Sequence, residues 1–388
     1  MSVFKQYIIV MAGAFVGLAS MLMAFNYHHD IHFLYHFGEV SSYNRGYERE
    51  FKPWHVRNAK PEVVVIGNSR PLYSFDTTRI SKKNSYNFAI AGANTWETVR
   101  NFEHILYTSA PKLVFLSVDN VCSNIADKTN VHVMGNALRE MRAHYYRILA
   151  LLNTEAFNAW LTDKLPSNDE LYDRSGRRTR FESNRTMAEG FRFRENNKIK
   201  NRFKSQWSES CNVRAITRLL TLAHENNVDL KMFINPIHIR YIEVDHQFKY
   251  TEQLLNIRKK RFVELNELVA QQFGKKPFTI YDFLEINDVT TEFVDLSSTD
   301  FPKYWYESSH YKKNVGDMMI DRMMSNRPEG GTAFGTEINT SNIDAHIQQQ
   351  WALLSEWRTK SPHVVNDIRQ SMERIGQELG KQVPQKPN

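Results

Sequence analysis

Five short runs of β-branched and other apolar residues constrain the fold of this chain more than any other feature. They cover residues 62–67, 86–91, 113–118, 229–234 and 278–283. Helix-length segments lie between them, at residues 95–108, 212–226 and 253–273. Continuous apolar strands that alternate with helices are typical of a parallel sheet covered on both faces. The sequence therefore predicts an α/β fold with a parallel sheet of about five strands.

One long interruption separates the third strand from the fourth. Residues 122–210 are longer than a crossover helix requires, and we interpret them as an insertion whose residues 138–165 are helical. Between Leu171 and Leu220 the chain has thirteen Lys or Arg residues and five acidic residues, whereas its whole net charge is +7. The basic excess therefore lies in this segment, which is either a solvated face or a surface that attracts anionic headgroups or an acidic polymer.

An unbroken apolar run at residues 8–25 follows a single basic residue, Lys5. The run is just long enough to cross a bilayer as a helix, and it ends without the small residues of a cleavable signal. We therefore predict a transmembrane anchor over residues 1–25. Because positive charge prefers the cytoplasmic side, the expected topology is a single-pass protein of the inner membrane with its body outside the cytoplasm, in the periplasm of a Gram-negative cell.

The segments that flank the predicted α/β domain, residues 61–325, have different characters. Residues 26–60 form a juxtamembrane segment in which His28, His32 and His36 recur at helical spacing among aromatic residues. This pattern favours an interfacial helix, with a metal site as the alternative. Residues 326–388 begin with a glycine-rich connector and continue as a helical extension, with helices at residues 343–357 and 364–379 and no further strand of the sheet.

The two cysteines, Cys122 and Cys211, are too few for a disulfide scaffold or a cysteine-rich zinc domain. Outside the cytoplasm they are free to form a disulfide, and the sequence equally allows two reduced, buried thiols. The same compartment argues against nucleic acid as a partner.

Polar residues follow several of the predicted strands, where ligands of parallel sheets collect. A serine follows the first strand in the turn Gly67-Asn68-Ser69-Arg70, and a Glu-x-x-His pattern precedes a helix at residues 312–324. The other candidates at this edge are Gly92 and Asn94 after the second strand, Asp119 and Asn120 after the third, and His238 after the fourth.

These residue types suit nucleophilic catalysis. A serine on a tight turn needs a base, and His310 has a carboxylate three residues earlier, Glu307, that can orient its ring. The backbone N–H groups of Ser69 and Gly92, together with the side-chain amide of Asn94 or Asn120, are candidates for an oxyanion hole. Candidates for substrate contacts are Arg70, Asp119 and His238.

The same blocks resemble those of the SGNH/GDSL hydrolases. Gly67-Asn68-Ser69-Arg70 looks like the nucleophile block, Glu307-Ser308-Ser309-His310 resembles the Asp-x-x-His block, and Gly92 falls where the family has its oxyanion-hole glycine. The resemblance covers residues 62–324 and implies a flavodoxin-like three-layer sandwich. The third block departs from the family, because Gly-x-Asn-Asp is replaced by Ser117-Val118-Asp119-Asn120, and Glu307 replaces an aspartate.

With its anchor, the layout resembles membrane-tethered SGNH-like proteins of bacterial envelopes, such as D-alanyl transfer and polysaccharide O-acetylation proteins. The resemblance implies a serine esterase or O-acyltransferase that acts on acyl esters, above all acetyl esters, of an envelope glycan, with no metal or organic cofactor. It also implies an acylated glycan or acidic polymer as substrate and a multi-span membrane O-acyltransferase as partner. The alternative is a non-catalytic SGNH-fold subunit that binds a glycan or a membrane partner, which the altered third block and the large insertion favour.

Overall fold

The computed structural model describes residues 2–36, 47–119, 130–162, 171–181, 184–204, 212–325 and 334–384. Within these ranges the main sheet has six strands in the order β2-β1-β3-β4-β5-β8. Five of them are parallel: β1 (Val63–Ile66), β2 (Ser85–Asn87), β3 (Leu113–Ser117), β4 (Asp229–Ile234) and β5 (Thr279–Asp282). Four of them lie within the apolar runs that predicted them, whereas β2 begins one residue before its run and covers only the first two residues of it. The α/β fold is confirmed.

The sixth strand, β8 (Thr336–Ile338), corrects the expectation that the C-terminal extension contributes helices alone. It pairs antiparallel with β5 and forms an edge of the sheet. A run of three residues is too short for its alternation to be recognised, and Glu337 gives it a polar character. The extension is therefore part of the main fold.

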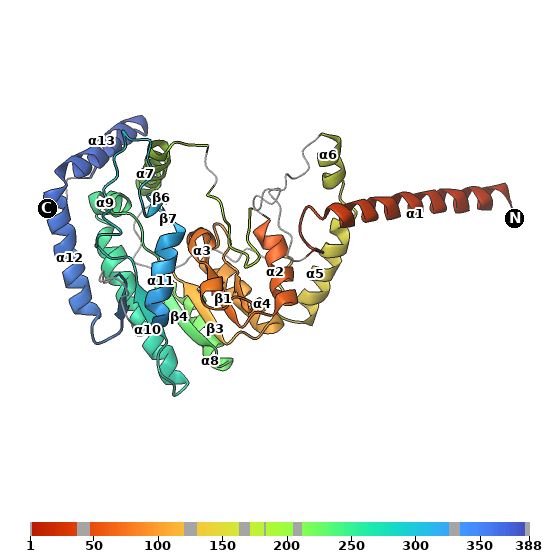
Figure 1. The fold of residues 1–388 in the computed structure, drawn as a ribbon, viewed down its shortest axis with the longest axis horizontal. Coiled ribbons are helices and arrows are strands. Elements are labelled where there is room, and N and C mark those ends of the chain that lie inside the picture. The colour runs from red at the N-terminus through yellow and green to blue at the C-terminus, as the bar shows by residue number, and fades with distance from the viewer. Residues whose placement is uncertain are drawn as a thin grey trace.

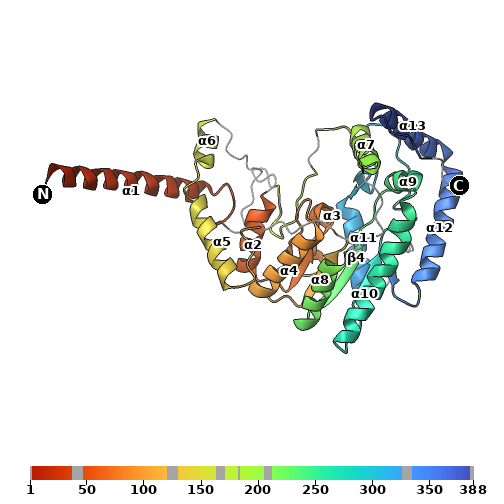
Figure 2. The same cartoon turned by 180° about the vertical axis from the view of Figure 1, so that it is seen from behind.

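Helices cover both faces of the sheet because successive strand residues point to opposite sides. Val64 and Ile66 belong to the core beneath α4 (Thr95–Thr108), α8 (Arg214–Glu225), α10 (Arg258–Gln272) and α12 (Ile343–Lys360). Val65 belongs to the core on the other face, which α11 (Lys313–Ser325) covers together with the start of α7 (Met187–Lys204). Figures 1 and 2 show these layers from the two sides.

Shorter elements complete the described parts of the body. These are α3 (Ser69–Ser74), the 3-10 turn η1 (Thr77–Arg79), α9 (Ile239–Gln247), the π-helical turn η2 (Gln253–Ile257) and the hairpin of β6 (Trp305–Glu307) and β7 (His310–Tyr311). The hairpin stands apart from the main sheet and leads directly into α11.

The N-terminal helix α1 (Val3–His29) is long and apolar enough to cross a membrane, with a mean hydropathy of 2.3 over its most apolar window. It projects away from the body in Figure 1. The helix ends at Asp30, which has a left-handed backbone conformation, so His32 and His36 do not continue a helical stripe. His32 contacts Glu50 instead, and His36 contacts Asp30. The predicted interfacial helix over this segment is therefore wrong, and the described residues contain no group of three potential metal ligands.

The juxtamembrane segment also contributes to the body through α2 (Glu48–Ala59), beside α4. Lys52 on this helix is buried, and its Nζ donates hydrogen bonds of 2.7 to 2.8 Å to the carbonyl oxygens of Asn87, Ala89 and Gly176. Burial lowers the pKa of Lys52 to about 7. These bonds connect α2 to the end of β2, to Ala89 just after it and to a loop of the insertion.

The predicted helix at residues 138–165 of the insertion is divided into α5 (Ala137–Ala150) and α6 (Glu155–Leu161). The basic part, where no helix was predicted, contains the helix α7. Asn120, Cys122 and Cys211 lie outside the described residues.

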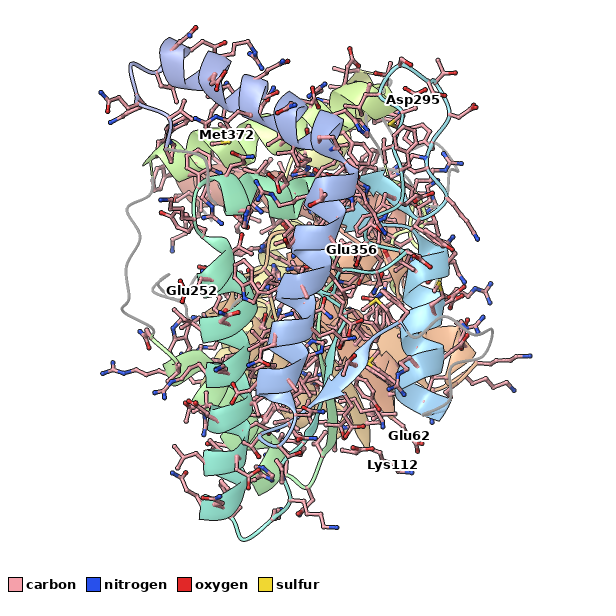
Figure 3. All side chains as sticks on the ribbon, turned by 90° about the vertical axis from the view of Figure 1, so that its left-hand side faces the viewer. Glu62, Lys112, Glu252, Asp295, Glu356 and Met372 are labelled. Carbon is pink, nitrogen blue, oxygen red and sulfur yellow. The ribbon has the colours of Figure 1, made fainter. Side chains whose placement is uncertain are left out.

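The C-terminal helices α12 and α13 (Pro362–Glu378) form as the sequence predicted, and they pack onto the body. Met372 of α13 is buried with Ile199 of α7 and Val244 of α9. Figure 3 looks onto these helices. Glu62 and Lys112, which form an ion pair of 3.0 Å just before β1 and β3, mark the edge of the sheet where the parallel strands begin.

Candidate active site

The candidate nucleophile lies in the turn between β1 and α3. Gly67 is required there, because a Cβ atom at this position would lie 2.5 Å from the Cβ of Ser117 and 2.8 Å from the Cγ of Pro71. Asn68 caps α3, with its Oδ1 accepting a hydrogen bond of 3.0 Å from the backbone N–H of Arg70. Ser69 is the first residue of the helix, so its position is fixed by the strand before it and by the cap.

The base and its carboxylate partner are on the hairpin of β6 and β7. Glu307 ends β6 and His310 begins β7, with a two-residue turn between them. The backbone N–H of Ser309 donates to Glu307 Oε2 at 2.9 Å, so the turn itself holds the carboxylate.

Close packing of α11 against α3 brings the hairpin to the serine. A Cβ atom at Gly316 would lie 2.1 Å from the carbonyl oxygen of Ser74, so only glycine allows this approach. The hydroxyl of Ser74 donates to the carbonyl oxygen of Tyr311 at 2.6 Å, which ties the end of α3 to β7.

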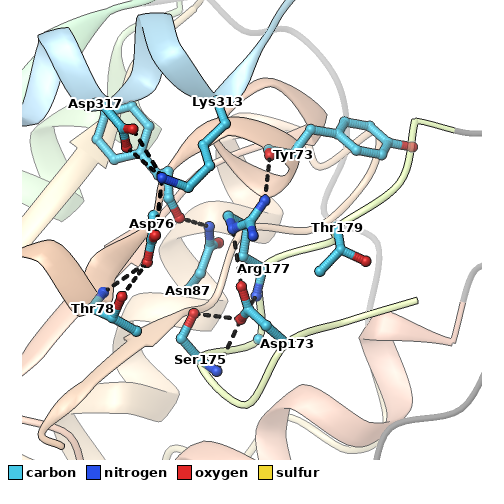
Figure 4. Close-up of polar contacts among 12 residues, drawn as sticks. Tyr73, Asp76, Thr78, Asn87, Asp173, Ser175, Arg177, Thr179, Lys313 and Asp317 are labelled. Atoms are coloured by element: carbon cyan, nitrogen blue, oxygen red, sulfur yellow. Dashed lines mark hydrogen bonds and ion pairs between the residues drawn. The ribbon is translucent and has the colours of Figure 1, made fainter. Parts of the chain in front are cut away.

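Figure 4 shows a second set of contacts that holds the same elements. Lys313, the first residue of α11, contacts Asp76 at 3.1 Å and Asp317 at 2.9 Å. Arg177 of the insertion donates to the carbonyl oxygen of Tyr73 in α3 at 3.4 Å and forms an ion pair of 3.0 Å with Asp173. The turn with Ser69, the helix after His310 and a loop of the insertion are thus joined.

Ser69, His310 and Glu307, which are far apart in the sequence, form one hydrogen-bonded chain. Ser69 Oγ lies 2.7 Å from His310 Nε2, and His310 Nδ1 is hydrogen-bonded to Glu307 Oε1. His310 and Glu307 are both buried. The structure therefore brings the three predicted catalytic residues together in the order that a serine nucleophile, a base and an orienting carboxylate require.

The environment of the chain favours a neutral imidazole and a charged carboxylate. Burial lowers the pKa of His310, and the nearby cations Arg194 and Arg70 lower it further, although Glu307 acts in the opposite direction. Burial alone would raise the pKa of Glu307, but His310, Arg194 and the Ser309 N–H outweigh that effect and lower it. A neutral His310 is ready to accept a proton, and a charged Glu307 stabilises the imidazolium that results.

Arg194 is a site residue that the sequence did not reveal. It comes from α7 in the insertion, and its Nε lies 3.3 Å from Glu307 Oε1. No local pattern links residues so far apart, and in the sequence Arg194 is one of many basic residues in its segment.

Gly92, the predicted oxyanion-hole glycine, has a left-handed backbone conformation. Gly92 has a φ of +66°, which favours glycine. The backbone N–H groups of Ser69 and Gly92 donate no hydrogen bond to another residue that the structure describes. Asn94 uses its Oδ1 to cap α4, accepting from Glu97 N at 2.9 Å.

Gly92, Asn94 and Asn68 line a cavity of about 240 Å³ next to the nucleophile turn. Part of its wall is apolar, formed by Leu116 and Ile216 among others. A cavity with backbone donors and an apolar wall suits a short acyl chain whose carbonyl oxygen lies near the N–H groups.

Asp119 occupies the third block in a way that differs from the family pattern. Its carboxylate contacts Arg70 Nη1 at 2.8 Å, accepts a hydrogen bond from the side chain of Asn68, and accepts another of 2.6 Å from Asn235. Tyr311 in turn donates to Asn235 at 2.7 Å. Arg70 and Asp119, both predicted to contact substrate, thus hold each other beside Ser69.

His238 is not part of this cluster. It is buried at the start of α9, where its Nε2 lies 2.8 Å from the carbonyl oxygen of Glu292 and its Nδ1 accepts from Arg240 N at 3.3 Å. Burial lowers its pKa to about 3. Both ring nitrogens have partners within the protein, which fits a role in packing and helix capping in place of the predicted substrate contact.

A second cavity, of about 270 Å³, is strongly basic. Two carboxylates line it, those of Asp119 and Asp245. Four cations also line it: Arg70, Lys198, Arg202 and Arg258. Asp245 pairs with both Lys198, at 2.6 Å, and Arg202, at 2.7 Å.

Arg258 is the cation of this cavity with no carboxylate of its own among the described residues. Its Nε is buried without a hydrogen-bond partner, and burial together with Arg202 lowers its pKa. A cavity in which cations outnumber carboxylates suits an anionic ligand group.

A third cavity, of about 380 Å³, lies on the side of Glu307. Its walls include the stacked rings of Phe181 and Tyr306, whose centroids are 4.6 Å apart, and the side chains of Arg194 and Lys312. The ring of Phe181 also lies 5.3 Å from that of His310. Aromatic walls with a few charged groups are typical of ligand sites.

Much of the predicted basic surface of the insertion is paired within the protein. On α7, Arg192 binds Asp367 of α13, Arg194 binds Glu307, and both Lys198 and Arg202 bind Asp245. These cations therefore connect the insertion to the rest of the body, and they are not a uniformly solvated face.

Comparison with known proteins matches this chain to no family model and to no curated protein. Its function therefore has to be inferred from the geometry of the site.

Proposed function

We propose that this chain is a membrane-anchored serine esterase or O-acyltransferase of the SGNH type, acting on acyl esters of an envelope glycan. The observation that carries the proposal is the chain of contacts from Ser69 Oγ to His310 Nε2, at 2.7 Å, and from His310 Nδ1 to Glu307. The resemblance of the sequence blocks to SGNH/GDSL hydrolases supports the same class, as does the parallel sheet with Ser69 at the carboxyl end of β1.

In the proposed reaction, Ser69 Oγ attacks the ester carbonyl carbon while His310 Nε2 takes the hydroxyl proton. Glu307 stabilises the imidazolium, and the N–H groups of Ser69 and Gly92 hold the negative oxygen of the tetrahedral intermediate. The C–O bond to the alcohol then breaks, and His310 returns the proton to that oxygen. Water or a sugar hydroxyl then attacks the acyl carbon while its proton passes to His310. The bond from that carbon to Ser69 Oγ breaks, and His310 returns the proton to Oγ, which restores the serine and gives an esterase or a transferase respectively.

The cavities support a short acyl group on an acidic sugar. The cavity beside Gly92 suits acetyl, the aromatic cavity beside Glu307 suits a sugar ring, and the basic cavity beside Arg70 suits a carboxylate or phosphate on the same glycan. We propose the basic cavity as the site for the acidic group of such a polymer. The reaction requires neither metal nor organic cofactor.

We propose α1 as a single-pass anchor in the inner membrane with the body on the extracytoplasmic side. Lys5 at the start of an apolar helix supports this direction. An enzyme in this position would receive or deliver acyl groups beside a multi-span membrane O-acyltransferase, which is the protein partner that we propose.

A non-catalytic binding subunit is the second candidate, and the third block favours it. Asp119 takes the position of the asparagine in the Gly-x-Asn-Asp block of SGNH hydrolases, where the asparagine side chain donates to the oxyanion. Its carboxylate is held by Arg70 and Asn68. An acidic group there offers no hydrogen-bond donor to an oxyanion, which leaves the backbone N–H groups and the side-chain amide of Asn94 or Asn120 as the candidate donors.

Covalent labelling by a serine-directed fluorophosphonate distinguishes the two candidates. We expect the full-length chain to be labelled and both Ser69→Ala and His310→Ala to lose the label. Ser309→Ala is a matched control, because its hydroxyl faces His310 Nδ1 at 3.1 Å and not Nε2. We expect Ser309→Ala to be labelled. Absence of labelling of the folded wild-type chain at any pH from 6 to 9 would favour the binding subunit.

A further inference from the structure

An apolar stripe on α5 faces away from the body. Leu138, Met141, Tyr145 and Ile148 are 55% to 71% exposed. Their spacing of three, four and three residues places them on one side of the helix. On the neighbouring short helix α6, Trp160 and Leu161 are 51% and 60% exposed. A soluble surface seldom collects this many large apolar side chains, and such patches mark interaction sites.

The opposite side of α5 carries the polar contacts with the body. Glu140 forms an ion pair of 2.5 Å with Arg57 of α2, and Arg139 lies 3.2 Å from Glu103 of α4. The guanidinium of Arg147 lies 4.4 Å from the ring of Trp54. The usual orientation of a surface helix is therefore reversed, with charged residues inward and apolar residues outward.

The stripe is continuous with the foot of the membrane helix. Phe25 of α1 contacts the rings of Phe157 and Trp160 of α6, at centroid distances of 5.8 and 6.0 Å. Asn26 donates to the carbonyl oxygens of Leu151 and Asn153, both at 2.6 Å, in the segment between α5 and α6. Figures 1 and 2 show α5 and α6 on either side of this foot, both running across the direction of α1.

We infer that α5 and α6 lie in the interface of the bilayer that α1 crosses, with their apolar side chains in the boundary between headgroups and acyl chains. If α1 spans the membrane, helices that run across its foot lie along the membrane surface. Tyr145, Tyr146 and Trp160 are residue types that prefer this depth, since their rings are apolar and their polar atoms reach water. The inference rests on the proposed anchor and is independent of the proposed chemistry.

The surface would fix the orientation of the body as well as its distance from the membrane. One helix allows rotation about its own axis and tilting at its foot. Two further helices in the interface restrict both motions, so the active site would face a constant direction relative to the bilayer.

Photo-cross-linking of the full-length chain in phosphatidylethanolamine and phosphatidylglycerol liposomes tests the inference. A benzophenone amino acid replaces Tyr145 or Ile148 of the stripe, and Leu268 as the control. Leu268 is 54% exposed on α10, which is remote from α1 in Figure 1. After irradiation, phospholipid adducts are measured by mass spectrometry, and flotation of the same sample measures attachment to the liposomes.

We expect phospholipid adducts at positions 145 and 148, at least five times more frequent than at position 268. Equal adduct frequencies in a chain that floats would overturn the interfacial placement while the anchor stands. Covalent dimers through position 145 in place of lipid adducts would mean that the stripe binds a second copy of the chain. A folded chain that does not float would overturn both the anchor and the surface. Cross-linking and flotation do not depend on the reactivity of Ser69. A chain that fails to react with the fluorophosphonate would contradict the proposed chemistry and would leave the membrane result unchanged.

Discussion

Arg194 Nε lies 3.3 Å from Glu307 Oε1, so a side chain from the insertion contacts the carboxylate that orients His310. The insertion therefore contacts the candidate active site directly. Because Arg194 lowers the pKa of His310, it also helps to keep the base neutral.

Arg194→Gln should shift the pH dependence of turnover. Without this cation the pKa of His310 rises, so a larger fraction of His310 is protonated and inactive as a base at a given pH below neutrality. We expect the acidic limb of the kcat/KM profile to move to higher pH, with a loss of roughly three- to tenfold at pH 6. The exposed Lys200 on the same helix provides the control Lys200→Gln, whose profile should match that of the wild-type chain. If the acidic limb of the kcat/KM profile of Arg194→Gln is not shifted, Arg194 does not lower the pKa of His310.

Glu307→Gln should leave residual activity. The amide still holds the His310 ring in place, but it cannot stabilise the imidazolium electrostatically, so we expect kcat to fall by roughly 10²- to 10⁴-fold. Steady-state hydrolysis of a chromogenic acetyl ester measures this fall. A variant as active as the wild-type chain would show that Glu307 does not assist His310.

The body should lose stability in mild acid. Burial lowers the pKa of His55 and His104 to about 4 and that of His238 to about 3. Between pH 6.5 and these lowered pKa values, the histidines are protonated in the unfolded chain but remain neutral in the folded chain. The free energy of unfolding therefore falls as the pH falls through this window. Glu243 has the opposite effect on stability, because burial raises its pKa to about 7 and its folded form therefore binds a proton as the pH falls. Since these three histidines oppose one glutamate, we expect the net stability to fall.

Urea unfolding at pH 7.5 and pH 5 measures this effect, with His238→Asn as the diagnostic variant. Asparagine also caps helices, and it does not titrate in this range. We expect the difference in the free energy of unfolding between the two pH values to be smaller in His238→Asn by on the order of 2 kcal/mol. If the free energy of unfolding changes equally between pH 7.5 and pH 5 in both proteins, His238 is protonated at pH 5 in the folded state as readily as in the unfolded chain.

Gly316→Ala should loosen the contact between α11 and α3. The new Cβ would lie 2.1 Å from the carbonyl oxygen of Ser74, so the backbones of α11 and α3 would have to move apart. We expect this movement to lower the free energy of unfolding by about 1–3 kcal/mol. Activity should fall as well, since the contact positions His310 against Ser69. Gly190→Ala is the matched change inside α7, where the nearest atom would be 3.6 Å away, and it should be neutral or stabilising by up to about 1 kcal/mol. Equal stability of both variants would contradict the close approach.

The sequence predicted the sheet and most helices because their signals are local. Buried strands such as β3 lie in short apolar runs, and α4 lies at residues 95–108 as predicted. The end of α1 was not predictable in the same way. It depends on the left-handed conformation of Asp30 and on contacts of Asn26 with residues more than a hundred positions later.

The three residues of the hydrogen-bonded chain were also predictable, because each follows a local rule. Ser69 stands directly after a strand, and Glu307 precedes His310 by three residues. The partners that tune them obey no such rule. Arg194, and the contacts of Asp119 with Asn235 and Arg70, depend on how elements distant in sequence meet in space.

The placement of β8 and α13 has a consequence for how the chain is made. Helix α1 is synthesised before these elements, whereas β8 completes the edge of the sheet at β5, His346 of α12 binds the buried Asp282, and Met372 fills a core with Ile199 and Val244. The described body is therefore complete only after α13 has left the ribosome. Until then the edge of β5 lacks its antiparallel partner and Asp282 lacks the contact with His346, so premature termination anywhere before α13 leaves an unfinished domain.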